Sequence, residues 1–185
     1  PIIVAVHPVT LEQETTRDAS ALITALESID HPVVFCFPNA DEGFERIIEM
    51  AESFCSARED AVLHRHVEHL CFWGLLKHAS VIVGNSSCGI MESPSIGLPC
   101  VNIGNRQHGR LRSDNIIDVE AIPALIASAI GRAMDPSFRG SLVGMDATYG
   151  DGDAGRRIAD ALATCPLGEV LLQKQTQEAI LSKSH

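Results

Sequence analysis

Short apolar segments alternate with longer segments of helical periodicity along most of the chain, and this alternation is the strongest constraint on the fold. The apolar segments are rich in β-branched residues and are predicted to be buried strands, at 2–6, 33–37, 61–64, 80–83, 100–103 and 116–119. The segments with apolar residues at helical spacing are predicted to be helices, at 11–29, 44–55, 68–79, 88–95 and 120–134. This order predicts an α/β protein with a doubly wound, Rossmann-like parallel sheet and right-handed crossovers.

Local signals predict where some of these elements begin and end. The capping-box pattern from Thr10 to Gln13 predicts the start of the first helix, and Pro32 lies just beyond its end. Residues 135–152 contain proline and glycine and are predicted to be a surface connection. Two further helices are predicted, at 153–163 and 169–182. The second follows no strand, and we expect it to dock on another part of the protein.

Composition limits the class of protein. At 185 residues and 45% hydrophobic content, the chain can form one sizeable core, which favours a single domain. The formal net charge of -10 argues against nucleic acid and anionic membrane surfaces as partners. We find no apolar run of the roughly 20 residues that a membrane span needs, and no basic segment before an apolar one at the start, so a cytoplasmic protein is expected. The six cysteines form no C-x-x-C pair and are expected to be reduced and buried.

Notable polar residues follow several of the predicted strands. Parallel strands end at one edge of a sheet, where α/β proteins bind ligands. The residues expected at this edge are His7, Asn39, the region 64–66, Ser86–Ser87 and Arg106. The sequence therefore predicts a polar ligand site there.

The turn from Val83 to Glu92 joins an apolar strand to a glycine- and serine-rich helix entry. Ser86 and Ser87 could bind a phosphate through hydroxyl and backbone groups, although plain helix capping explains them equally well. The turn is not a nucleophile elbow, because Cys88 stands where that motif needs glycine. It also matches neither a Walker loop nor G-x-G-x-x-G. Glu92, on the same short helix, could accept hydrogen bonds from a vicinal diol such as a ribose, or it could simply be solvated.

Three arginines, Arg106, Arg110 and Arg112, fall within seven positions of a strongly acidic chain. Such a cluster suits an anionic ligand, since a charge-assisted hydrogen bond to phosphate contributes about 1.5–3 kcal/mol. The alternative is a set of salt bridges within the chain, to Asp114 and Asp118.

The histidines have weaker signals. His7 ends the first predicted strand and could contact a phosphate or transfer a proton, although a histidine before proline is also often structural. His64, His66 and His69 suggest a zinc cluster at first sight. Alternate residues at a strand end point in opposite directions, however, and no further ligand stands at a suitable spacing. We therefore expect neither a metal nor a cofactor.

The assembled motifs resemble those of the hydrolysing UDP-N-acetylglucosamine 2-epimerases, the family that serves sialic-acid pathways. Six motifs occur in the order typical of that family, namely 7–10 (HPVT), 37–41 (FPNAD), 84–92 (GNSSCGIME), 97–104 (GLPCVNIG), 105–110 (NRQ-x-GR) and 149–152 (YGDG). The resemblance implies a GT-B-type enzyme, with two Rossmann-like domains and the active site between them. It implies that 1–185 is the single carboxyl-terminal, UDP-binding domain and that the amino-terminal half is absent from this sequence.

The resemblance also implies partners and site residues. The partners are UDP and a UDP-amino sugar, the missing amino-terminal domain, and a second copy in the full-length protein. The implied site residues are His7 near the reacting sugar, Asn39 and Val67 at the uridine, Ser86 and Ser87 at the diphosphate, Glu92 at the ribose, and Arg106 at a phosphate or beside the sugar. The implied reaction is elimination of UDP across C1–C2 followed by hydration, which releases UDP and N-acetylmannosamine. The proton-transferring carboxylates would belong to the missing half, so this chain alone is expected to be inactive.

The sequence is also compatible with other functions. The sugar could be a diacetamido sugar, the enzyme could be non-hydrolysing, and the chain could be a stand-alone nucleotide-binding module or a GT-B glycosyltransferase domain. In the feedback-inhibited animal epimerase, the helix after the Pro-Asn-x-Asp loop carries basic residues. Here Glu45 and Glu49 flank Arg46, which favours a bacterial enzyme without that feedback.

Overall fold

A computed structural model describes residues 1–11, 13–37, 44–168 and 172 of the chain. The chain divides into two units, residues 1–149 and 150–185. The first unit contains six strands, β1 (Ile2–Ala5), β2 (Val33–Cys36), β3 (Ala61–His64), β4 (Val81–Gly84), β5 (Cys100–Ile103) and β6 (Ile116–Val119). Its helices are α1 (Arg17–Leu26), α2 (Phe44–Ser56), α3 (His69–His78), α4 (Ser87–Met91), α5 (Pro123–Met134) and α6 (Pro136–Ser141), with a 3-10 turn, η1, at Ser93–Ile96.

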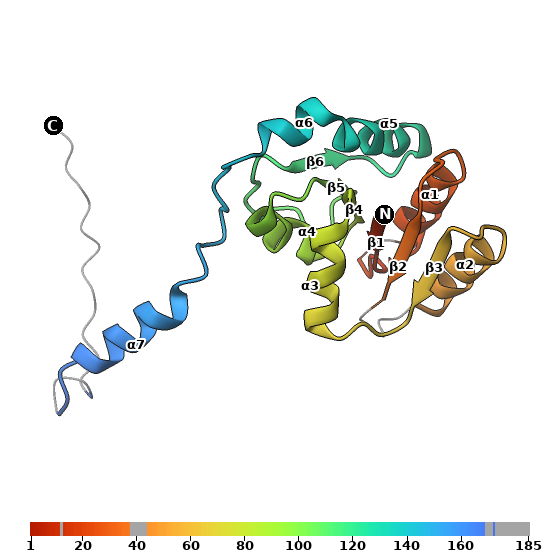
Figure 1. Cartoon of the computed structure of the whole chain (residues 1–185). Helices are drawn as coiled ribbons and strands as arrows, with labels where there is room; N and C mark the ends of the chain where they lie inside the picture. Colours follow the sequence, from red (N-terminus) through yellow and green to blue (C-terminus); the bar gives the residue numbers. More distant parts are fainter. Residues whose placement is uncertain (12, 38–43, 169–171, 173–185) are drawn as a thin grey trace, which may run out of the picture. The chain divides into compact units, whose positions relative to one another are not determined.

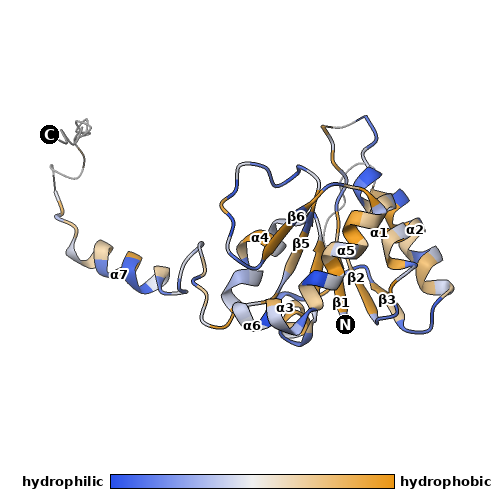
Figure 2. Ribbon diagram, turned by 90° about the horizontal axis from the view of Figure 1, so that it is seen from above, coloured by the Kyte–Doolittle hydropathy of each residue, from blue (hydrophilic) through white to orange (hydrophobic). Residues whose placement is uncertain are grey.

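The six strands form one sheet in the order β3-β2-β1-β4-β5-β6, and all five neighbouring pairs are parallel (Figure 1). The predicted doubly wound, Rossmann-like sheet is therefore confirmed. Its strands are coloured as hydrophobic in Figure 2, which is typical of a sheet covered on both faces.

Alternation along the strands divides the core between the two faces of the sheet. Ile2 and Val4 of β1 belong to the cluster that also contains buried residues of α1, α2 and α5. Ile3 and Ala5 belong to the second cluster, which contains Leu76 of α3. Because successive side chains of a strand point to opposite faces, four residues of β1 anchor helices on both sides.

Some predicted boundaries are wrong. The first helix begins at Arg17, after Thr16, and not at the Thr10 capping box. The backbone N–H of Val9 donates to the carbonyl of Thr15, Thr10 lies in a turn, and Leu11 is 98% exposed. Leu11 and Thr15, whose spacing suggested an earlier helix start, therefore lie before α1 and not in it.

The predicted surface connection 135–152 is correct only in part, because Pro136–Ser141 forms the short helix α6. The Asp135 side chain accepts hydrogen bonds from the backbone N–H groups of Ser137 and Phe138, and Pro136 occupies the first turn. Aspartate before proline is a helix-start signal, and it outweighed the glycines that follow.

The thiol prediction is correct only in part. All six cysteines are free, and Cys36 and Cys100 are buried, but Cys71 is exposed on α3. Only the apolar spacing around Cys71 had suggested burial.

The second unit contains α7 (Ala154–Thr164), with Ile158 and Leu162 exposed. The predicted helix at 169–182 lies almost wholly outside the described residues. Among the described helices, none is long and apolar enough to cross a membrane.

Candidate functional site

The order of the strands defines one switch point in the sheet. The chain proceeds from β1 through β2 to β3 on one side, and from β4 through β5 to β6 on the other. In open α/β sheets, ligands bind beyond the carboxyl ends of the strands at this point. Here that position is formed by the segment after β1, which carries His7, and the turn after β4, which carries Ser86.

Gly84 allows β4 and β1 to approach closely where the turn begins. It has a φ of +143°, and a Cβ atom added to it would lie 2.1 Å from the carbonyl oxygen of Ala5. The same oxygen accepts a hydrogen bond from the backbone N–H of Ser86 at 3.2 Å. The chain can turn here only because residue 84 has no side chain.

Asn85 joins three segments of the site and is fully buried. Its Oδ1 accepts from the backbone N–H of His7 at 2.8 Å, and its Nδ2 donates to the His7 carbonyl at 2.9 Å. Nδ2 also donates to Oδ2 of Asp18, in the first turn of α1, at 2.9 Å. The Asn85 carbonyl accepts from Arg106 Nη1 at 3.1 Å and from Gln107 Nε2 at 2.9 Å. Asn85 belongs to the 84–92 motif, but the sequence alone did not predict this role for it.

The arginine cluster has divided roles. Arg112 forms a salt bridge with Asp118, with 2.9 Å between Nε and Oδ2, so the salt-bridge alternative is correct for this residue. Arg110 Nε donates to Oε1 of Gln107 at 2.6 Å. Arg106 donates to the backbone carbonyl of Asn85, directly after β4, and it lines a cavity of about 660 Å³ together with the 8–11 segment.

A cavity of about 400 Å³ lies at the switch point, on the side of α3. This volume is within the range of small-molecule sites. The residues that line it include Phe37, Val67, Phe72, Ser86, Cys88 and Glu92. The walls combine aromatic and aliphatic groups with a hydroxyl and a carboxylate, a composition that suits a flat ring bearing polar substituents.

The structure places three of the predicted site residues, Val67, Ser86 and Glu92, in this one cavity. His7 is only 3% exposed, and its backbone is held by Asn85. Ser87 is half-buried at the first position of α4, and Arg106 lines the neighbouring cavity. Asn39 lies outside the described residues.

The hydroxyl of Ser86 has an unusual partner. Ser86 is the N-cap residue of α4, yet its side chain makes no capping hydrogen bond. Instead, its Oγ accepts a hydrogen bond from the Cys88 thiol, with 3.1 Å between Sγ and Oγ. Burial raises the pKa of the Cys88 thiol to about 11, so the thiol is protonated near neutral pH.

The α3 side of the cavity is ordered by short-range contacts. The Glu68 carboxylate caps α3 by accepting from the backbone N–H groups of Leu70 and Cys71, at 2.9 and 3.2 Å. One turn along, Nε1 of Trp73 donates to Nε2 of His69 at 3.2 Å, and His69 lines the cavity. Among the described residues, no three histidine, cysteine or acidic side chains are placed to hold a metal ion.

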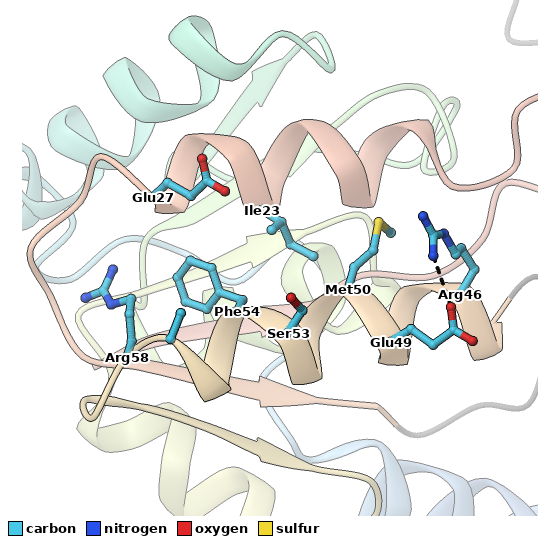
Figure 3. A pocket seen from close by; sticks show the side chains of 9 residues that line it. Ile23, Glu27, Arg46, Glu49, Met50, Ser53, Phe54 and Arg58 are labelled. Carbon is cyan, nitrogen blue, oxygen red and sulfur yellow. Dashed lines mark hydrogen bonds and ion pairs between the residues drawn. The ribbon is translucent and has the colours of Figure 1, made fainter.

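A separate cavity of about 480 Å³ lies between α1 and α2 (Figure 3). Its floor is formed by Ile23, Met50 and Phe54, and Arg46 at one end is paired with Glu49 at 3.1 Å. Both partners of this pair are more than half exposed, so the charge of Arg46 is balanced within its own helix.

Together, these features define a doubly wound α/β protein with a ligand-sized cavity at its switch point. Residues 1–163 match the family model described as UDP-N-acetylglucosamine 2-epimerase. The chain belongs to this family.

Curated relatives agree with this assignment. GDP/UDP-N,N'-diacetylbacillosamine 2-epimerase (hydrolyzing) of Campylobacter jejuni is 37% identical over 121 residues, which cover 64% of this chain and 32% of the relative. UDP-N,N'-diacetylbacillosamine 2-epimerase (hydrolyzing) of Legionella pneumophila is 32% identical over 170 residues, which cover 91% of this chain and 44% of the relative. UDP-N-acetylglucosamine 2-epimerase of Neisseria meningitidis is 35% identical over 128 residues, which cover 69% of this chain and 33% of the relative. The chain thus spans less than half of the length of these relatives.

Solved structures share the fold. A structure of the S. aureus protein MnaA with UDP superposes with a TM-score of 0.69 at 16% identity, over 87% of this chain and 43% of that one. UDP-GlcNAc 2-epimerase from Neisseria meningitidis, bound to UDP-GlcNAc, superposes with a TM-score of 0.65 at 15% identity, over 88% of this chain and 43% of that one. The similarity covers one Rossmann-like half of a GT-B-type enzyme.

Proposed function

We propose that this chain is the UDP-binding, carboxyl-terminal part of a hydrolysing UDP-amino-sugar 2-epimerase. The observation that supports this most directly is the cavity of about 400 Å³ at the switch point, which is lined by Ser86 and Glu92. Membership of the 2-epimerase family supports a UDP-sugar as the ligand of this cavity. The proposal includes an amino-terminal half that completes the enzyme, since the matched relatives are more than twice as long as their matched parts.

In this proposal, the uracil ring lies against Val67 and the aromatic wall, and the Glu92 carboxylate accepts hydrogen bonds from the ribose hydroxyls. Ser86 and Ser87 bind the diphosphate. Asn39 is assigned to the uridine by family resemblance alone. Arg106 approaches the diphosphate from the neighbouring cavity, where its guanidinium is already directed by the Asn85 carbonyl.

The chemistry of this part is stabilisation of a leaving group. The C2 proton is removed while the bond from C1 to the diphosphate oxygen breaks, which gives a glycal and UDP. Water then adds across the double bond, with hydroxyl at C1 and hydrogen at C2, and the 2-epimeric free sugar is released. Negative charge grows on the diphosphate as the bond breaks, and in this proposal Arg106, the serines and His7 stabilise it. The groups that move protons at the sugar are assigned to the amino-terminal half.

Two sugars are candidates. UDP-N-acetylglucosamine follows from the family and from the Neisseria relative. A UDP-linked diacetamido sugar is favoured by a specific observation, because the relatives at 37% and 32% identity are both named as diacetylbacillosamine 2-epimerases. The sugar itself would contact mainly the amino-terminal half.

Calorimetric titration of the chain with UDP tests the site. We expect binding, and we expect Arg106→Ala and Ser86→Ala each to weaken it about tenfold or more, because each removes a hydrogen bond to a charged oxygen. Ser56→Ala at the end of α2 and Arg156→Ala in the second unit are matched controls and should bind normally. A folded chain that binds no UDP at millimolar concentration contradicts the proposed function.

The reaction is tested with a protein that includes both halves, incubated with UDP-N-acetylglucosamine or with a UDP-diacetamido sugar. NMR should detect the free 2-epimeric sugar and UDP. A sugar that is epimerised but still attached to UDP would identify a non-hydrolysing enzyme instead.

A further inference from the structure

The hydrogen bond between Cys88 and Ser86 has a consequence for the diphosphate site, and the inference rests on the proposed function. A hydroxyl group has one O–H donor and two acceptor lone pairs. At the N-cap of a helix, a serine oxygen usually accepts from a backbone N–H group. Ser86 does not do so, and one of its lone pairs is occupied by the Cys88 thiol at 3.1 Å.

The position of the thiol is fixed by packing beneath α4. A Cβ atom added to Gly89 would lie 2.7 Å from Sγ of Cys100, so α4 approaches β5 closely at this residue. Cys100 is 2% exposed. Because Gly89 directly follows Cys88, this close approach fixes the backbone that carries the thiol.

The thiol can only donate to Ser86 while it is protonated. Burial raises its pKa to about 11; the hydrogen bond with Ser86 opposes this shift, and the nearby Glu92 carboxylate adds to it. The S–H group therefore keeps its proton through the neutral range, and its hydrogen bond to Ser86 persists there.

We propose that Cys88 is a positioning residue that turns the Ser86 hydroxyl into a donor for the diphosphate. With one lone pair of Oγ occupied by the thiol, the O–H bond of Ser86 is directed away from α4 and toward the cavity that both residues line. A phosphate oxygen accepts hydrogen bonds and cannot donate one at neutral pH, so a hydroxyl held as donor suits it. Without the thiol, Ser86 can rotate and cap α4.

The test compares two ligands, UDP and uridine, in calorimetric titrations of the chain and its variants. We expect Cys88→Ala to weaken UDP binding about threefold to tenfold, the effect of one modest hydrogen bond. Uridine has no diphosphate, and its affinity should not change. Cys88→Ser restores a donor at the same position and should recover most of the UDP affinity.

A double-mutant cycle separates positioning from packing. If Cys88 acts through the Ser86 hydroxyl, then Cys88→Ala should add no further loss of UDP affinity in the Ser86→Ala variant. Cys71→Ala removes an exposed thiol on α3 and should bind both ligands normally. Equal losses for UDP and uridine, no loss at all, or an additive double mutant would each overturn the positioning role. These outcomes leave the proposed function intact as long as the unmodified chain binds UDP.

Should Cys88→Ala fail to fold, infrared spectroscopy provides the test. The S–H stretching band of a hydrogen-bonded thiol moves to higher frequency when the acceptor is removed. The difference spectrum between the unmodified chain and Ser86→Ala should show this movement, and a difference spectrum without it overturns the proposal.

Discussion

Replacing Asn85 with alanine tests the idea that one buried amide holds three segments of the site together. The substitution removes the acceptor for the His7 N–H group, the donor to the His7 carbonyl and a donor to the Asp18 carboxylate. Each of these groups is buried, and a buried polar group that loses a hydrogen bond costs about 1–3 kcal/mol. Allowing for some relaxation, we expect the free energy of unfolding to fall by about 3–5 kcal/mol.

The measurement is urea unfolding followed by circular dichroism. Asn105→Ala, at an exposed position 20 residues further along the chain, is the matched control, and its effect should be within about 0.5 kcal/mol. Asn85→Asp keeps the shape and the Oδ1 acceptor but turns a second oxygen toward the Asp18 carboxylate. It should therefore destabilise the chain at least as much as alanine near neutral pH. A loss below about 1 kcal/mol for Asn85→Ala would refute the idea that Asn85 holds the segments of the site together.

Three further predictions concern the backbone and the thiols. Gly84→Ala should destabilise the chain by more than about 3 kcal/mol or prevent folding, because its Cβ would lie 2.1 Å from the Ala5 carbonyl oxygen. Gly140→Ala on α6 is the control, since no atom lies within 4 Å of the added Cβ. Its melting temperature should equal or exceed that of the unmodified chain. Near-normal melting of Gly84→Ala would contradict the close approach of β4 and β1. Burial raises the pKa of the Cys36 thiol to about 12 and of the Cys88 thiol to about 11, so in the folded chain these thiols should react with Ellman's reagent much more slowly than the exposed Cys71 thiol. Because the unfolded thiols ionise near their ordinary pKa of 9.0 and the folded ones do not, the urea midpoint should fall as pH rises above about 9; a midpoint that rises there would show that the sign is wrong.

The strands were predictable because each is a short apolar run, and in β1, β2, β4 and β5 nearly every residue is buried. Three of them, Ala61–His64, Cys100–Ile103 and Ile116–Val119, have the predicted bounds. The start of α1 was not predictable from local pattern, because the capping box at Thr10 lies in a turn that the Val9 to Thr15 hydrogen bond closes. A local helix signal fails where a hydrogen bond within the same loop holds the backbone in another conformation.

The location of the candidate site was predictable, because the loops that follow parallel strands lie at one edge of the sheet. This argument predicted Ser86 and the region 64–66 at one edge, and Ser86 and His66 do line the same cavity. The hydrogen bonds of Asn85 were not predictable, because its partners His7 and Asp18 are 78 and 67 positions away in the sequence. The sequence left two roles open for the three arginines, an anionic ligand or salt bridges within the chain. The structure shows that Arg112 forms a salt bridge with Asp118.

The contact between His69 and Trp73 supplies an optical reporter. Trp73 is the one tryptophan in the sequence, and its indole N–H donates to a histidine that lines the cavity. Any ligand that displaces or polarises His69 changes the surroundings of the indole ring, so it changes the emission of the protein. Occupancy of the cavity can therefore be followed in the native chain by fluorescence, without a label or a substitution.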